Sequence, residues 1–166
     1  MRRLWLAVPL CMLWAHPAFG QTDNAPPAPK DRAVDFTDAA LDAAANELVA
    51  RNLITRRVLE GGTFSINVRH ISGAETALSH GEITEVWVVR DGSGTVATGG
   101  TLVNPQPGNG PGELRGSAIQ GGHERTIKAG DIIFIPPGVP HGIKQATSIT
   151  YMNIRFVAKE PTAAQR

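Results

Sequence analysis

Residues 130–141 of this chain read GDIIFIPPGVPH. The pattern predicts a turn at Gly130, a short buried strand over 132–135, and a second turn that leads into His141. Proline cannot donate to a strand ladder, so the strand must end at Pro136. A histidine held by such a rigid turn has a fixed direction, which a metal ligand requires. Alternatively, His141 caps a hairpin and contacts only water, and this stretch alone leaves both interpretations open.

The first 20 residues are typical of a signal peptide rather than of folded structure. An arginine pair at 2–3 is followed by an apolar core over 4–15 and a small-x-small cleavage site, AFG, at 18–20. The apolar run is too short for a transmembrane helix, and the leucine before Cys11 disfavours a lipid anchor. We therefore expect an exported soluble protein, periplasmic or secreted, with no membrane association after cleavage.

Cleavage after Gly20 would change the charge and the cysteine content of the chain. The 16 basic residues become 14, against 15 acidic residues, because two arginines and no acids are lost. This near-neutral balance argues against nucleic acid or an anionic membrane as a partner. The single cysteine, Cys11, is also lost, so the mature chain has no disulfide or thiol chemistry. Four histidines remain for imidazole chemistry: His70, His80, His123 and His141.

The remaining residues suffice for one domain with a substantial core, and no internal repeat is visible. We expect a Pro-rich linker over 21–36 and a helix over 37–52, capped by Thr37 or by an aspartate just before it. The apolar stripe of this helix would lie on the outside of a sheet or against a second subunit. Residues 53–158 contain many short β-prone runs separated by turns, which favours an antiparallel sandwich or barrel. We expect residues 159–166 to form a C-terminal tail.

Two Gly-rich segments are expected to interrupt the strands. Residues 91–94 read DGSG, which predicts a turn between one strand over 83–90 and another over 95–98. Residues 104–116 read NPQPGNGPGELRG, which predicts a long loop. We interpret this loop as a surface excursion rather than as a cover over the barrel mouth.

A second stretch with chemical potential lies at residues 80–94, HGEITEVWVVRDGSG. Glu85, Trp87 and Val89 share one face of the predicted strand, and the opposite face is apolar as well. A carboxylate in a strand that is buried on both sides needs a cation or hydrogen bonds. A lysine or arginine partner would satisfy Glu85, and so would a divalent metal ion shared with nearby histidines.

This stretch resembles the first motif of the cupin family, which has the form G-x5-H-x-H-x3 or x4-E-x6-G. Glu85 and Gly92 match its second half, and His80 stands at its second histidine. Leu78 occupies the place of the first histidine, and leucine cannot ligate a metal. In another register His80 takes the first-histidine place and Glu82 the second, but Glu82 is then one residue too close to Glu85.

The opening stretch resembles the second cupin motif, G-x5-P-x-G-x2-H-x3-N, with Gln145 in place of the final Asn. The positions that match are Gly130, Pro136, Gly138 and His141. Together the resemblance spans roughly residues 63–157. It implies an all-β, antiparallel cupin β-barrel (a double-stranded β-helix of the jelly-roll type) with one N-terminal helix, and a homodimer, which is common among small cupins.

Carried over residue by residue, the resemblance implies three metal ligands: His80, Glu85 and His141. Two histidines and one carboxylate form a recognised set for Fe(II), and Zn(II) or Mn(II) would also accept it. The family includes dioxygenases, isomerases and lyases, and the fold does not choose among them. We therefore expect a mononuclear metalloenzyme that acts on a small molecule. Because the first histidine is missing, the alternative is a non-catalytic protein that binds a small ligand or the metal itself.

Other polar and aromatic residues are candidates for lining a pocket. His70 lies on an otherwise apolar face of its predicted strand, and the residues of the other face are polar. His70 is therefore either a core histidine or part of the barrel lining. Trp87 shares the strand face of the glutamate ligand. Tyr151 and Arg155 lie on one face of the last long strand, and they would receive an oxygen-rich ligand if this face is the interior one. Gln145 is the last of these candidates.

Overall fold

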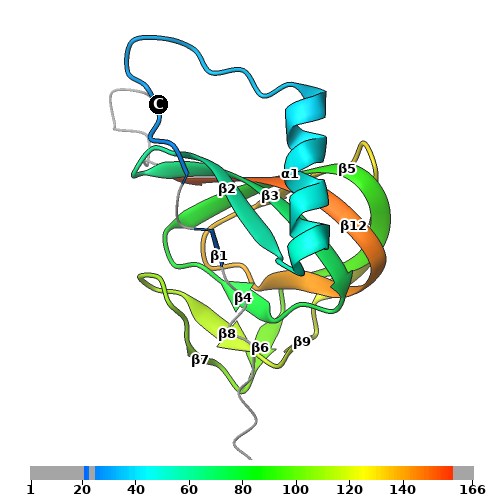
Figure 1. The fold of residues 1–166 in the computed structure, drawn as a ribbon. Helices are drawn as coiled ribbons and strands as arrows, with labels where there is room; N and C mark the ends of the chain where they lie inside the picture. The colour runs from blue at the N-terminus through cyan, green and yellow to red at the C-terminus, as the bar shows by residue number, and fades with distance from the viewer. Residues whose placement is uncertain (1–20, 23–24, 159–166) are drawn as a thin grey trace, which may run out of the picture.

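The computed structural model describes residues 21–22 and 25–158 of the chain (Figure 1). The predicted signal peptide over 1–20 and the predicted tail over 159–166 lie outside the described residues. In the part that is described, no helix has the length and apolar character needed to cross a membrane.

The described residues form one helix and a set of mainly antiparallel strands. In chain order they are β1 (Gln21–Thr22), α1 (Asp38–Arg51), β2 (Thr55–Glu60), β3 (Phe64–Gly73), β4 (Ala77–Ser79), β5 (Ile83–Thr98), β6 (Thr101–Val103), β7 (Gln106–Pro107), β8 (Leu114–Gly116), β9 (Ala118–Gln120), β10 (His123–Lys128), β11 (Ile132–Ile135) and β12 (His141–Val157). The prediction of an antiparallel β-structure with one N-terminal helix is confirmed.

The barrel is organised around two long strands, β5 and β12, which pair with each other from Ile83–Val157 at one end to Thr98–His141 at the other. On its other edge β12 pairs with β3, and β5 pairs with both β10 and β11. Figure 1 shows these strands curving around a common interior. That interior holds the main apolar core: Ile71, Trp87, Val89, Val96, Ile127, Ile133, Ile135, Ile143, Ala146, Ile149 and Tyr151.

The turn predicted at residues 91–94 is wrong, because β5 runs through this segment without a break. Gly92 has a φ of +73°, and the β5–β12 pairing shifts register between Thr150 and Tyr151. A Cβ on Gly92 would lie 2.1 Å from the carbonyl oxygen of Ser148. The glycine therefore serves a bulge within a long strand rather than a turn between two short ones.

Helix α1 packs on the outer face of the sheet, above β2 and β3 (Figure 1). Its predicted N-cap is confirmed, since the side chain of Thr37 accepts a hydrogen bond of 3.2 Å from the backbone N–H of Ala40. The apolar side of the helix forms a second, smaller core with the outer face of β3: Leu41, Ala44, Leu48 and Val68. The helix thus covers the barrel from outside, and the barrel interior is left to other residues.

A side chain at Gly92 would have two costs: a left-handed backbone conformation and a clash with the backbone of β12. Comparison with Gly121 separates them. Gly121 also has a positive φ, +71°, but no atom of the described residues lies within 4 Å of the point that a Cβ on Gly121 would occupy. We expect Gly121→Ala to lower the free energy of unfolding by about 1–2 kcal/mol, the cost of the left-handed backbone. Gly92→Ala should lower it by about 1–3 kcal/mol more, because the backbone of β12 must also move.

Urea denaturation of the two variants, followed by circular dichroism, measures this difference. Equal destabilisation by Gly92→Ala and Gly121→Ala would show that the close approach of β12 is unimportant.

Candidate metal centre

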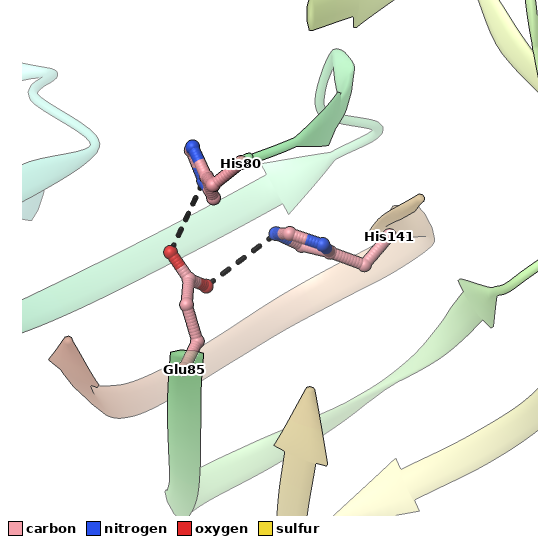
Figure 2. Close-up of side chains that lie close together, drawn as sticks. All are labelled: His80, Glu85 and His141. Atoms are coloured by element: carbon pink, nitrogen blue, oxygen red, sulfur yellow. Dashed lines mark ion pairs between the residues drawn. The ribbon is translucent and has the colours of Figure 1, made fainter. Parts of the chain in front are cut away.

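Three side chains that the sequence suggested as ligands converge inside the barrel (Figure 2). Glu85 lies in β5, His141 is the first residue of β12, and His80 lies between β4 and β5. All three are buried: the exposed fractions of Glu85, His141 and His80 are 2%, 2% and 5%. One ligand atom from each lies within 4.8 Å of the others.

The turn before β12 holds the two histidine segments together. Pro136 and Pro137 end β11, and Gly138 has a φ of +77°, which suits a residue without a Cβ. Its backbone N–H then donates a hydrogen bond of 2.7 Å to the carbonyl oxygen of His80. The rigid turn therefore aims His141 and also anchors the segment that carries His80.

The separations suit one metal ion bound to all three residues. His80 Nε2 lies 3.2 Å from Glu85 Oε1, and His141 Nε2 lies 3.4 Å from Glu85 Oε2. Two ligands at right angles around an ion with bonds of about 2.1 Å are themselves about 3.0 Å apart. An ion would fit between these atoms after small side-chain movements, and the donor set is one that Fe(II), Mn(II) and Zn(II) accept.

Both imidazoles are oriented by a second contact at Nδ1. The Nδ1 of His141 lies 2.8 Å from the carbonyl oxygen of Val139. Because a carbonyl can only accept, Nδ1 donates to it, and Nε2 points at Glu85, where a metal ion would take the place of the Nε2 proton. The Nδ1 of His80 faces a carboxylate oxygen of Glu113 at 3.3 Å. A carbonyl or carboxylate behind the histidine is the usual support of a metal-bound imidazole.

Glu113 was not predicted as a site residue, and the interpretation of residues 104–116 as a surface excursion is wrong at this end of the segment. Strand β8 pairs with β4, with Leu114 opposite Ser79, so Glu113 is brought next to His80. The other oxygen of Glu113 accepts from the backbone N–H of Asn109 and from Arg115 Nε. Burial would raise the pKa of Glu113, but these hydrogen bonds hold it below its usual value.

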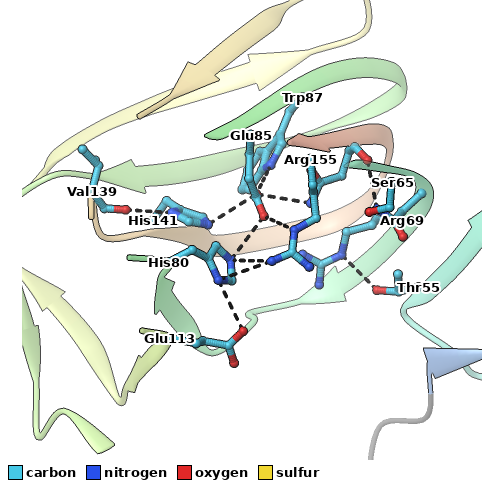
Figure 3. A network of polar contacts seen from close by, with 12 residues as sticks. Thr55, Ser65, Arg69, His80, Glu85, Trp87, Glu113, Val139, His141 and Arg155 are labelled. Carbon is cyan, nitrogen blue, oxygen red and sulfur yellow. Dashed lines mark hydrogen bonds and ion pairs between the residues drawn. The ribbon is translucent and has the colours of Figure 1, made fainter. Parts of the chain in front are cut away.

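The carboxylate of Glu85 is surrounded by donors (Figure 3). Its Oε2 accepts from Trp87 Nε1 at 2.7 Å and from Asn153 Nδ2 at 3.2 Å. Its Oε1 lies 2.9 Å from Nε of Arg155, which stands directly opposite on β12. Burial alone would raise the pKa of Glu85, but hydrogen bonds from His141 and His80 and the charge of Arg155 lower it well below its usual range. Glu85 therefore has the arginine partner as well as the two histidines.

The other suggested pocket residues divide between the two faces of their strands. Trp87 and Tyr151 are fully buried and stacked at 4.6 Å inside the barrel, and Arg155 shares their interior face. His70 does not reach the site: it shares the outer face of β3 with residues under the helix, and its Nδ1 contacts Thr150 Oγ1 at 3.0 Å. Gln145 is exposed on β12 and does not line the interior. Strand alternation accounts for His70, and the register shift between Ile143 and Gln145 turns Gln145 away from the interior face.

The low pKa of Glu85 gives the metal-free protein a specific acid sensitivity. The carboxylate ionises near pH 4.3 in the unfolded chain and at lower pH in the folded one. Its contribution to stability is therefore complete above about pH 4.3 and is lost as the pH falls through the folded pKa. In Glu85→Gln we expect the slope of unfolding free energy against pH to be smaller by up to about 1.4 kcal/mol per pH unit in this window.

Chemical denaturation between about pH 3 and pH 6, with a chelator present, measures these slopes. Glu124→Gln is the matched control, because Glu124 is half exposed and pairs only with Lys144 in the described part of the chain. The same slope in wild type and Glu85→Gln would contradict the assignment.

The chain is similar to a known family of domains and to several solved structures. A sequence profile described as the AraC-like ligand binding domain matches residues 116–165. No curated protein matches the chain. Protein BH2720 from Bacillus halodurans has a similar solved structure, with 17% sequence identity over 76% of this chain and 83% of that chain and a TM-score of 0.51.

Two further solved structures are more distantly similar. One is an uncharacterized conserved protein with a double-stranded β-helix domain from Klebsiella pneumoniae, with 17% identity over 64% of this chain and 84% of that chain and a TM-score of 0.44. The other is a cupin-2 domain containing protein from Shewanella frigidimarina, with 18% identity over 70% of this chain and 90% of that chain and a TM-score of 0.43.

Proposed function

We propose that this protein, whose fold is the cupin-type double-stranded β-helix that its motifs predicted, is a mononuclear metalloprotein that acts on a small molecule. His80, Glu85 and His141 would hold the ion. The observation that carries the proposal is the arrangement of the two imidazoles: both present Nε2 to the same carboxylate, and both are supported at Nδ1. A structural histidine needs no such pair of contacts, whereas a metal ligand does.

The bound ion would supply Lewis-acid or oxygen-activating chemistry. The residues of the chain would fix its ligands and exclude bulk water. Trp87 and Asn153 hold the Glu85 carboxylate in place, and the stacked ring of Tyr151 closes the interior beneath it. Three protein ligands leave coordination positions for water, substrate or dioxygen. The reaction we propose is of the dioxygenase, isomerase or lyase type.

The proposal includes export and assembly. The signal-like residues 1–20 support a periplasmic or secreted location, and the resemblance to small cupins supports a homodimer. The profile match to a ligand-binding domain over 116–165 supports a small molecule as the partner.

One observation favours a second candidate, a non-catalytic protein that binds a small ligand. Arg155 already lies 2.9 Å from Glu85, and a guanidinium next to the ligand set opposes a divalent cation. The missing first histidine at Leu78 removes one ligand from the family's set as well. In this alternative the carboxylate, the arginine and the histidines bind an organic ligand directly.

Metal content separates the two candidates. Wild-type protein without a histidine tag should retain about one equivalent of a divalent ion after dialysis, as measured by mass spectrometry of the metal. His80→Ala, His141→Ala and Glu85→Gln should each lose it, because only two ligands remain. His123→Ala is the control, since His123 is exposed on β10 and should leave the metal content unchanged. A folded wild-type protein that takes up no metal would refute the first candidate.

The supporting role of Glu113 has its own test. In Glu113→Gln the charge behind His80 is lost while the side-chain size is kept. We expect the affinity for Zn(II), measured by competition with a chelator, to fall about 10- to 100-fold. Glu124→Gln should bind Zn(II) like wild type. Unchanged affinity in Glu113→Gln would mean that the Glu113–His80 contact does not orient the ligand.

A further inference from the structure

The metal site is surrounded by three ion pairs, and each joins one carboxylate to one arginine. Glu85 contacts Arg155, Glu113 contacts Arg115, and Glu75 contacts Arg69 at 3.4 Å. The two pairs deepest in the barrel are largely removed from water, since the side chains of Glu75 and Glu85 are 4% and 3% exposed. The protein charges around the site are therefore already balanced when both imidazoles are neutral.

A divalent ion at this site brings two positive charges that the described residues do not balance. Uncompensated charge in a buried environment is costly, and it is relieved by a counter-ion. The protein has no further carboxylate in contact with the three ligands in the described part of the chain, apart from Glu113, which Arg115 already neutralises. The compensating charge must then come with the ligand.

Arg155 is placed to receive that charge. Its Nε lies 2.9 Å from Glu85 Oε1, but the N–H does not point along this line, and Nε has no hydrogen-bond partner among the described residues. Within the same part of the chain, its Nη2 contacts only the ring nitrogens of His80, at 3.4 Å, and these face carboxylates already. The guanidinium thus lies beside Glu85 and His80 with most of its donors unused; the side chain as a whole is 26% exposed, although Nε itself is buried.

Resting on the proposed metal site, we propose that the ligand of this protein is a small carboxylate, whose negative group binds Arg155 while an oxygen occupies an open position on the metal ion. The planar fork of a guanidinium matches a carboxylate in shape and charge. Arg69 adds a second positive charge on the same interior face, since it stands opposite Tyr151 in the β3–β12 ladder. Metal and carboxylate then bind cooperatively, each raising the affinity of the other by the same factor.

Acetate is the probe, and Zn(II) affinity is the readout. Zn(II) binding to the full-length, tag-free protein is measured by chelator competition at constant ionic strength, without addition, with acetate, and with acetamide. Acetate should raise the apparent Zn(II) affinity of wild type about 10-fold or more at saturation. Acetamide, which has the same size and no charge, should have no effect.

Three variants assign the effect to Arg155. In Arg155→Gln the ratio of the Zn(II) affinity with acetate to the affinity without it should fall to about one, whatever the affinity without acetate is. Arg155→Lys should retain part of the effect, since it keeps the charge without the fork. Arg56→Gln is the matched control, because Arg56 pairs with Glu47 of the outer helix and should respond to acetate like wild type.

The outcomes are distinguishable. Zn(II) binding that acetate does not strengthen, or strengthens equally in Arg155→Gln, would overturn the carboxylate inference and leave the metal site standing. An equal effect of acetamide would overturn it too, because charge would then not be recognised. Failure of wild type to bind Zn(II) under any condition would overturn the proposed function and the inference with it.

Discussion

The structure depends on one buried negative charge, the carboxylate of Glu85. It is 2% exposed on the interior face of β5, so the barrel must supply its solvation. Trp87 and Asn153 donate to one oxygen, Arg155 lies against the other, and an imidazole approaches each. The polar part of the interior is therefore arranged around this group, and the apolar core fills the rest of the barrel.

The pairing of β5 with β12 determines which residues reach that charge. Arg155 stands opposite Glu85 and Asn153 opposite Trp87, so three of the contacts come from one stretch of ladder. The same β12 begins with His141, far along the strand, and the curvature of the sheet returns it to Glu85 (Figure 2). The third ligand is His80, whose carbonyl oxygen accepts a hydrogen bond from the backbone N–H of Gly138 that anchors its segment at the site. A closed barrel is needed, because no local segment contains all three ligands.

Arg155 explains how the same site can be stable without an ion and still accept one. Without metal, the arginine and the histidines hold Glu85 as an ionised group, and the pKa of this carboxyl is far below its usual range. In the proposed metal-bound state the arginine would be an excess positive charge beside the ion. That change in balance would link metal binding to the binding of an anion.

The sequence by itself indicated the turn that aims His141 and the capped helix with its apolar stripe, because both depend on residues close together in the chain, which local backbone rules govern. Its resemblance to the two cupin motifs implied the three candidate ligands. Only the tertiary structure decided that residues 91–94 form a bulge in a long strand, that the Tyr151 and Arg155 face is interior, and that His70 is not. It alone brought Glu113 to His80, through the pairing of β8 with β4. The physical reason is that strand alternation defines two faces in any sequence, but only long-range pairing decides which face is enclosed and which distant side chains meet there.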